Sequence, residues 1–174
     1  MRTLFLCGFM GCGKSTIGER LAQLMRLQFI DLDNYIVDKV GMTIPDIFTR
    51  HSEEYFRSLE SKYIGELTGE SAVIATGGGA LINPSNAALA RKGGLVIFLD
   101  VQFSTCHMRI RGDENRPLVM SRSTKELEEL FSMRRELYIA NSDIIIDGNA
   151  PIDIVARRIE IAYKSALDKA MRGD

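Results

Sequence analysis

A glycine-rich run close to the N-terminus constrains this chain more than any other feature. The run spans positions 8–16 and reads GFMGCGKST, which matches the pattern G-x-x-x-x-G-K-[ST] in full. The apolar stretch Thr3–Cys7 precedes it, and apolar residues at helical spacing follow between Lys14 and Met25. The sequence therefore predicts a strand, a loop and a helix in the order typical of a phosphate-binding loop.

The residue types of this loop suit the triphosphate of a nucleotide. Glycines allow backbone N–H groups to point at phosphate oxygens, and the N-terminus of the following helix adds partial positive charge. The Lys14 side chain can reach the β- and γ-phosphates, and the Ser15 hydroxyl can ligate Mg²⁺. We predict that the loop binds ATP through Gly11, Cys12, Gly13, Lys14, Ser15 and Thr16.

Two observations narrow the range of reactions that this loop could serve. Cys12 is either a small residue that the loop tolerates or a thiol made oxidisable by the helix N-terminus, and for catalysis we favour the first interpretation. The chain has no N-K-x-D motif, which disfavours a guanine-binding switch protein. Phosphoryl transfer to a small acceptor, or ATP hydrolysis coupled to motion, remains as the predicted chemistry.

Four further apolar runs predict the rest of a sheet. They alternate with helical segments and are apolar throughout, as parallel strands buried on both faces are. We therefore predict an α/β fold, a three-layer α/β/α sandwich around a five-stranded parallel sheet, in one domain spanning residues 1–174. Ligands of such sheets bind beyond the carboxyl ends of the strands. The runs are Phe29-Ile30, Ala72–Ala75, Leu95–Leu99 and Asp143–Ile146.

Polar or glycine-rich residues follow two of these strands. Asp31-Leu32-Asp33 ends the second strand, and residues two apart on an extended chain face the same side. We expect both carboxylates to face the phosphate loop, with Asp31 supporting Mg²⁺ through a water and Asp33 accepting hydrogen bonds from substrate hydroxyls. The alternative is a turn-forming pair. The third strand ends in Thr76-Gly77-Gly78-Gly79, which suits a ligand lying close to backbone.

Arginines on the predicted helices offer positive charge for an anionic ligand. Arg57 has Glu60 three residues on, and Arg134 has Tyr138 four residues on. Each arginine alone would be assigned to an exposed helix face with a local partner. Whether these two arginines bind a ligand depends on where the fold places them.

A second group of arginines surrounds the aperiodic stretch Gly112–Ser121. A mobile loop of this kind beside a phosphate site predicts a lid, at about residues 112–123, that closes on ATP and stabilises charge in the transition state. The alternative is a loop that is merely well solvated. The arginines are Arg109, Arg111, Arg116 and Arg122.

Composition excludes several classes of protein. Lys and Arg number 22 against 23 Asp and Glu, a net charge of -1, which argues against a nucleic-acid-binding protein. No apolar window reaches the ~20 residues of a membrane span. The three cysteines show no C-x-x-C spacing, which favours reduced thiols in the cytoplasm. We expect a cytoplasmic enzyme that acts as a monomer and has no nucleic-acid or membrane partner.

Together these motifs resemble those of the shikimate kinase family over nearly the whole chain. The resemblance implies the fold of the nucleoside monophosphate kinases, with a five-stranded parallel sheet. It also implies Mg²⁺-dependent transfer of the γ-phosphoryl group of ATP to the 3-hydroxyl of shikimate. The matching parts are Gly8–Thr16, Asp31-Leu32-Asp33, Phe56-Arg57 with Glu60, Thr76-Gly77-Gly78-Gly79, Arg116-Pro117-Leu118 and Arg134 to Tyr138.

The resemblance also implies roles for individual residues of the substrate site. Asp33 would bind the shikimate hydroxyls and act as the base, and Arg57 and Arg134 would hold the carboxylate. This set agrees with the chemistry of a small anion with vicinal hydroxyls, since guanidiniums pair well with carboxylates. Backbone donors would come from Gly77, Gly78 and Gly79, within a substrate-binding segment at about residues 32–62 and the loop after the third strand.

On the nucleotide side, the resemblance implies that Asp31 assists Mg²⁺ beside Ser15. Arg116 would reach the ATP phosphates when the lid closes, and Arg109 would lie near the adenine. The adenine loop is expected after the fifth strand, at about Asp147 to Pro151. Catalysis would therefore fall chiefly to Lys14, Asp33 and Arg116.

Two alternatives stay open on the residues alone. Another small-molecule kinase of the same architecture, such as a gluconate or nucleotide kinase, would share the phosphate loop and the acidic strand end. A nucleotide kinase would need a base-reading site in place of Arg57 and Arg134. A non-catalytic ATP-binding protein is disfavoured because Lys14, Ser15 and both aspartates are all present.

Overall fold

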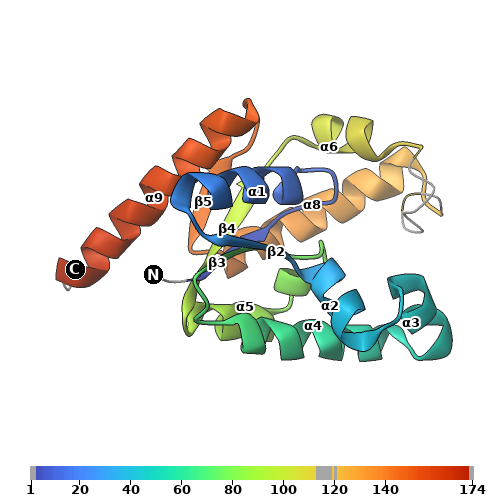
Figure 1. The fold of residues 1–174 in the computed structure, drawn as a ribbon. Coiled ribbons are helices and arrows are strands. Elements are labelled where there is room, and N and C mark those ends of the chain that lie inside the picture. Colours follow the sequence, from blue (N-terminus) through green and yellow to red (C-terminus); the bar gives the residue numbers. More distant parts are fainter. Residues whose placement is uncertain (1–2, 113–118, 120, 173–174) are drawn as a thin grey trace.

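The computed structural model describes residues 3–112, 119 and 121–172, and it confirms the predicted α/β fold (Figure 1). Five parallel strands form one sheet in the order β2-β3-β1-β4-β5. Residues 113–118, with Arg116 and most of the predicted lid, lie outside the described residues. The strands are β1 (Thr3–Cys7), β2 (Gln28–Asp31), β3 (Ala72–Ala75), β4 (Gly94–Asp100) and β5 (Ile144–Asp147).

Helices cover both faces of this sheet and complete the predicted three layers (Figure 1). Helices α1 and α9 pack together on one face, and α5 and α8 cover the other. Helices α2, α3 and α4 form a lobe beside the β2 edge of the sheet. The described helices are α1 (Lys14–Met25), α2 (Leu32–Val40), α3 (Ile44–Arg50), α4 (Glu53–Leu67), the 3₁₀ helix η1 (Ala80–Ile82), α5 (Pro84–Arg91), α6 (Phe103–Ile110), α8 (Thr124–Asn141) and α9 (Ile152–Arg172).

The parallel register aligns the strand ends that carry the sequence motifs. Asp31 pairs with Ala75, and Leu6 also pairs with Ala75. The phosphate loop, the start of α2 and the glycines after β3 therefore leave the sheet at one edge. This alignment follows from parallel pairing alone and places the candidate residues within reach of one ligand.

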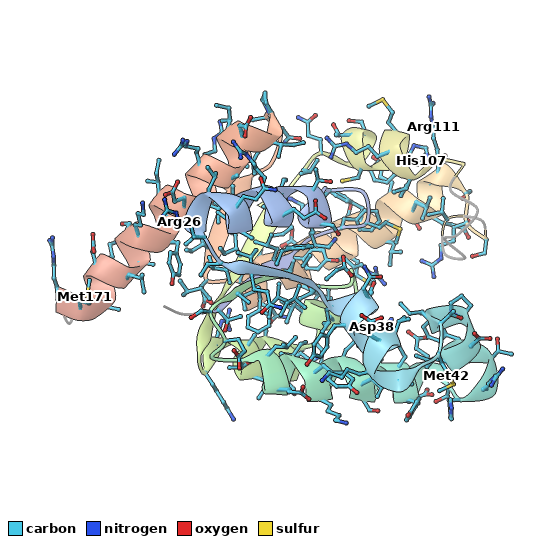
Figure 2. The ribbon with its side chains drawn as sticks, viewed as in Figure 1. Arg26, Asp38, Met42, His107, Arg111 and Met171 are labelled. Carbon is cyan, nitrogen blue, oxygen red and sulfur yellow. The ribbon has the colours of Figure 1, made fainter. Side chains whose placement is uncertain are left out.

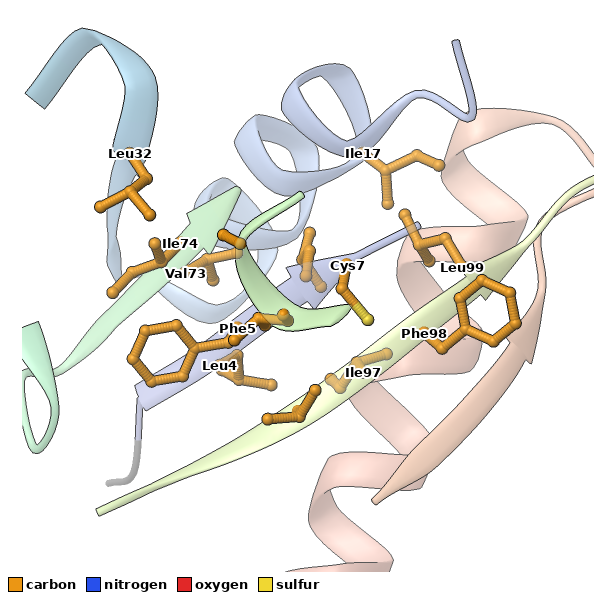
Figure 3. Close-up of a cluster of buried hydrophobic side chains, with 14 of the residues drawn as sticks. Leu4, Phe5, Cys7, Ile17, Leu32, Val73, Ile74, Ile97, Phe98 and Leu99 are labelled. Atoms are coloured by element: carbon orange, nitrogen blue, oxygen red, sulfur yellow. The ribbon is translucent and has the colours of Figure 1, made fainter. Parts of the chain in front are cut away.

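A continuous apolar core holds the strands between the helical layers (Figure 3). The central strand β1 is buried along its whole length, as its uninterrupted apolar run predicts. Its side chains alternate between the two faces, so Leu4 and Leu6 contact one helical layer and Phe5 and Cys7 the other. The sheet is consequently a rigid support for the loops at its carboxyl edge.

Side-chain caps start the helices where the sequence indicates. Ser52 accepts a hydrogen bond from the Tyr55 N–H, and Asn83 accepts one from the Ser85 N–H just before α5. At α8, the Ser123 hydroxyl accepts a hydrogen bond from the Glu126 N–H at 3.3 Å, while the Ser123 N–H donates to the Glu126 carboxylate at 2.8 Å. This capping box fixes the start of the helix that carries Arg134.

In the part of the chain that the structure describes, no helix combines the length and the apolar sequence needed to cross a bilayer.

Two helix glycines provide a test of packing between the layers. A Cβ at Gly18 of α1 would lie 2.6 Å from Cε2 of Phe29, whereas a Cβ at Gly65 of α4 would meet the flexible Leu89 side chain at 3.2 Å. We expect Gly18→Ala to lower the free energy of unfolding by about 1–3 kcal/mol through overpacking. Gly65→Ala is expected to be neutral or stabilising by up to about 1 kcal/mol, since alanine favours helix.

Urea unfolding of both variants measures these changes. Equal stability of the Gly18→Ala variant and the unsubstituted protein would contradict close packing of α1 on Phe29.

Candidate active site

A cavity of ≈ 380 Å³ lies at the carboxyl edge of the sheet and collects most of the predicted site residues. The phosphate loop forms one wall, with Lys14 and Ser15 facing the cavity. Residues after β2 and β3 form the opposite side, and Arg109 of α6 borders the opening. One cavity therefore brings together groups that are far apart in the sequence.

The phosphate loop owes its shape to its glycines. Gly8, Gly11 and Gly13 have φ angles of 145°, 80° and 95°, in the region that L side chains rarely adopt. A Cβ at Gly11 would lie 2.6 Å from the Cys106 carbonyl oxygen, so a side chain there would also clash with α6. The sequence pattern therefore reflects both backbone conformation and close packing.

The Lys14 ammonium is held by the loop itself. Its Nζ donates to the carbonyl oxygens of Gly8 at 2.8 Å and Phe9 at 3.2 Å. Gly13 precedes α1 in a left-handed conformation, which directs the helix N-terminus into the cavity. The loop thus presents a lysine, backbone donors and a helix dipole to any anion in the cavity.

Ser15 and Asp31 form the candidate cation site. The Ser15 hydroxyl donates to Oδ2 of Asp31 at 2.9 Å, and Oδ1 of Asp31 accepts from the Asn34 N–H at 3.3 Å. A hydroxyl and a carboxylate are hard oxygen donors of the kind that Mg²⁺ prefers. Among the described residues, no group of three or more His, Cys, Asp or Glu side chains could hold a metal. This donor set fits Mg²⁺ that arrives with nucleotide phosphates, because Mg²⁺ is usually bound by one or two carboxylates, phosphates and waters.

The predicted placement of Asp33 on an extended strand is wrong. Strand β2 ends at Asp31, which caps α2, so Asp33 lies in the first helical turn. The helix starts here because the Asp31 carboxylate accepts a backbone N–H and the apolar Leu32 is fully buried. Both aspartates nevertheless line the cavity. They meet there because Asp31 ends the strand and Asp33 lies in the first turn of the helix that follows. The two-residue alternation of an extended strand is not the cause.

The three glycines after β3 pack closely against three charged side chains, of which Asp33 lines the cavity. A Cβ at Gly77 would lie 2.8 Å from Oδ1 of Asp33, and one at Gly79 would lie 2.5 Å from Nη1 of Arg57. A Cβ at Gly78 would lie 3.8 Å from Nη1 of Arg134. The glycine run is therefore the point at which Asp33, Arg57 and Arg134 meet, and side chains at Gly77 or Gly79 would displace them.

Arg57 sits between two carboxylates of its own helix. Its Nη1 donates to Glu60 at 2.8 Å and its Nη2 donates to Glu53 at 2.9 Å. Glu60 is fully buried, and burial raises the pKa of its carboxyl above the ordinary value although Arg57 opposes the rise. Sequence spacing predicts the Arg57–Glu60 pair but treats it as exposed, since the burial depends on how α4 packs.

Arg134 extends from α8 toward Gly78, which lines the cavity, but the lining itself includes neither Arg134 nor Arg57. In the described part of the chain the Nε of Arg134 is buried without a hydrogen-bond partner. Four residues later, the Tyr138 hydroxyl donates to the Gly78 carbonyl oxygen at 2.5 Å. The i,i+4 spacing of Arg134 and Tyr138 places both on one helix face, but spacing alone does not predict the contact of Tyr138 with Gly78.

The four arginines grouped around the predicted lid have different locations. Arg109 donates from Nη1 to the Gly11 carbonyl oxygen at 3.1 Å. Arg111 lies at the end of α6 and points away from the cleft, as Figure 2 shows, and Arg122 is exposed. The predicted role of Arg116 falls outside the described residues. Of this group, Arg109 is the arginine that the structure places in the cavity wall.

A second cavity, of ≈ 250 Å³, continues from the phosphate loop toward β5. Thr16 and Arg109 line it together with Gly148 and Ala150 of the loop after β5. Asn149 shapes this loop because its side chain accepts from the Gln102 N–H at 3.0 Å and donates to Asp147 at 2.8 Å. The cavity lies where we predict the adenine loop and is wide enough to be a candidate for the nucleotide base.

The three cysteines are free thiols that lie in the core near the phosphate loop. Burial raises the pKa of Cys106 to about 12, and it raises that of Cys7 further still. Cys12 is 1% exposed, with its Sγ 3.7 Å from the Lys14 Nζ. Its burial favours the interpretation of Cys12 as a small packed residue.

Comparison with known proteins gives one family. The family model described as shikimate kinase matches residues 10–163. The chain is 41% identical to a shikimate kinase of Sulfurihydrogenibium sp. over 89% of this chain and 94% of that one. It is 43% identical to that of Geobacter sulfurreducens, over 88% and 87%.

The similar solved structures are also those of shikimate kinases. A shikimate kinase from Acinetobacter baumannii, in complex with shikimate, matches with a TM-score of 0.88 and 33% identity, covering 95% of this chain and 94% of that one. The shikimate kinase of Aquifex aeolicus matches with a TM-score of 0.83 and 31% identity, covering 95% and 98%.

The buried carboxyl of Glu60 predicts a particular pH dependence of stability. Because its pKa is raised on folding, the native state binds this proton more tightly than the unfolded chain, and stability falls as pH rises from 4.5 through the native pKa. Glu60→Gln removes this titration. We expect the free energy of unfolding of the variant, minus that of the unsubstituted protein, to become more positive as pH rises.

Glu54 is the matched control on the same helix. Hydrogen bonds from its own backbone N–H and from Ser52 lower its pKa, so its contribution is present at high pH and lost as pH falls. For Glu54→Gln the same difference should become more negative as pH rises. Urea unfolding at several pH values measures both, and equal slopes for the two variants would contradict the assignment.

Proposed function

The chain belongs to the shikimate kinase family, and we propose that its carboxyl-edge cavity carries out transfer of the γ-phosphoryl group of ATP to the 3-hydroxyl of shikimate. One observation carries the proposal: Asp33, Arg57 and Arg134 all lie against the glycines after β3, and two of these glycines, Gly77 and Gly78, line the cavity that Lys14 borders. This set combines a carboxylate for hydroxyl groups, two guanidiniums for a carboxylate and a cation for phosphate.

The phosphate loop and the start of α1 hold the nucleotide. Backbone N–H groups from Gly11 to Thr16 and the Lys14 ammonium bind the phosphate oxygens, with the helix dipole adding to the attraction. Ser15 would ligate Mg²⁺ directly, and Asp31 would hold it through a water. Bound Mg²⁺ neutralises charge that develops on the β- and γ-phosphates. Arg109 borders both cavities and faces the nucleotide where phosphates and base meet.

Asp33 and the two guanidiniums hold the acceptor. The Asp33 carboxylate accepts hydrogen bonds from the hydroxyls of shikimate and takes the proton of the attacking hydroxyl. Arg57 and Arg134 pair with the substrate carboxylate through charge-assisted hydrogen bonds. Gly77, Gly78 and Gly79 supply backbone donors at the same place. The protein thus contributes positioning and electrostatic stabilisation, which dominate the catalysis of phosphoryl transfer.

We assign the remaining parts of the chain by the same reasoning. Residues 32–62 form the substrate-binding segment of a single domain, and residues 112–123 form the lid that carries Arg116 to the phosphates. The three free, buried thiols support a location in the reducing cytoplasm.

A substrate comparison tests the proposed function. The protein with ATP and Mg²⁺ is given shikimate, gluconate or AMP, and ADP release is measured. We expect rapid release with shikimate and background release with the other two. Gluconate carries its carboxylate and hydroxyls on a flexible open chain, and AMP has no carboxylate for Arg57 and Arg134. Background release with shikimate would refute the proposed function, and release with gluconate or AMP alone would identify the acceptor as another class.

Asp33→Asn tests the assignment of the base. The amide keeps the size of the side chain but does not accept the proton, so we expect kcat to fall roughly a hundredfold or more while ATP binding is retained. Asp38→Asn is the matched control, because Asp38 is exposed on the same helix. Steady-state kinetics and ATP titration measure the two effects. Normal turnover in Asp33→Asn would remove Asp33 from the role of base.

A further inference from the structure

Helix α8 is joined to the segment after β3 by a row of side-chain hydrogen bonds. The Tyr138 hydroxyl donates to the Gly78 carbonyl oxygen at 2.5 Å, and Nδ2 of Asn141 donates to the carbonyl oxygens of Leu81 at 3.1 Å and Ile82 at 3.0 Å. Arg134 precedes them at helical spacing, on the same face of α8. One helix face therefore carries a proposed substrate ligand and contacts the proposed backbone donors.

Tyr138 is fixed more firmly than a surface tyrosine. Its side chain is 1% exposed, and its ring stacks on Phe98 of β4 with centroids 5.2 Å apart. Burial raises the pKa of the phenol far above its ordinary value, so the hydroxyl remains a donor throughout the range in which the protein is folded. The rigid sheet, through Phe98, thus sets where this hydroxyl lies.

The Tyr138 hydrogen bond determines the direction of an amide that it does not touch. The Gly78 carbonyl and the Gly79 N–H belong to one planar trans peptide, so they point in opposite directions. With the carbonyl directed at Tyr138, the Gly79 N–H is directed away from it. Glycine has more backbone freedom than any other residue, so the direction of this peptide depends on its contacts. The Ala80 N–H closes the turn by donating to the Gly77 carbonyl oxygen at 3.2 Å, and the Tyr138 hydroxyl fixes the Gly78 carbonyl.

The surroundings of Gly79 match an anionic ligand. A Cβ at Gly79 would lie 2.5 Å from Nη1 of Arg57, and one at Gly78 would lie 3.8 Å from Nη1 of Arg134. The Gly78–Gly79 peptide is therefore placed between the two guanidiniums. A fixed N–H there adds a directional donor to two flexible charged side chains.

We propose that Tyr138 is a positioning residue for the acceptor: through the Gly78 carbonyl it orients the Gly79 N–H to donate to an oxygen of shikimate between Arg57 and Arg134. This inference rests on the proposed function and deepens it. Tyr138 itself makes no contact with the substrate. Its effect falls on acceptor binding, since the phosphate loop holds ATP without it.

Tyr138→Phe tests this role because it keeps the ring on Phe98 and removes the hydroxyl alone. We expect KM for shikimate to rise about five- to tenfold, the effect of one lost buried hydrogen bond, with KM for ATP and kcat within about twofold of the unsubstituted enzyme. Tyr163→Phe is the matched control: Tyr163 is also 1% exposed but lies in α9, on the opposite face of the sheet. It should leave both KM values unchanged.

The outcomes separate a positioning role from a structural one and from failure of the proposed function. Unchanged KM for shikimate in Tyr138→Phe, or an equal rise in both KM values, would overturn the inference while leaving the proposed function intact. Absence of shikimate-dependent ADP release by the unsubstituted enzyme would overturn both.

An NMR measurement on the unsubstituted protein tests the same inference independently of any variant. In protein labelled with ¹⁵N-glycine, the assigned Gly79 amide proton should shift downfield when shikimate is added to saturation, as expected for a new hydrogen bond. The Gly41 amide is the internal control, because Gly41 lies at the end of α2 and already donates to the Val37 carbonyl oxygen at 2.8 Å. A Gly79 amide that does not move would refute the inference even if kinetics of the variant were altered.

Discussion

The close contact between the glycine run after β3 and three charged side chains is the constraint on which the site depends. Asp33, Arg57 and Arg134 come from α2, α4 and α8, which lie around different parts of the sheet. They converge because Gly77 and Gly79 leave space that a methyl group would fill. Close packing against the glycine backbone therefore positions the three charged side chains. The glycines follow β3 directly, so their position depends on the sheet.

The charges of this site are balanced locally, which explains how a chain with a net charge of -1 can bind anions. Arg57 is held by Glu53 and the buried Glu60, so its guanidinium is positioned before any ligand arrives. On α8 the adjacent Arg135 forms a bidentate pair with Asp100, at 3.0 and 2.6 Å. Arg134 points instead toward Gly78, where we propose that it binds the acceptor.

The sequence predicts the architecture well because each signal is local. The phosphate loop and the five apolar runs depend only on neighbouring residues, and the structure confirms the strands and the strand–loop–helix order. The prediction that Asp33 lies on an extended strand is wrong because a capping aspartate, Asp31, ends the strand and starts α2. The burial of Glu60 and the contact of Tyr138 with Gly78 depend on tertiary packing, so spacing along the chain does not reveal them. The roles of the site residues remain predictions.

The hydrogen bonds that Lys14 makes within its own loop limit how strongly the loop can bind a nucleotide. Its ammonium already satisfies two donors on the carbonyl oxygens of Gly8 and Phe9. Binding a phosphate therefore exchanges one set of hydrogen bonds for another, and the net gain is the difference between charged and neutral acceptors. The carbonyl oxygens of Gly8 and Phe9 therefore compete with a phosphate for the Lys14 ammonium. A catalyst that must release a product nucleotide after every turnover benefits from such moderated attraction.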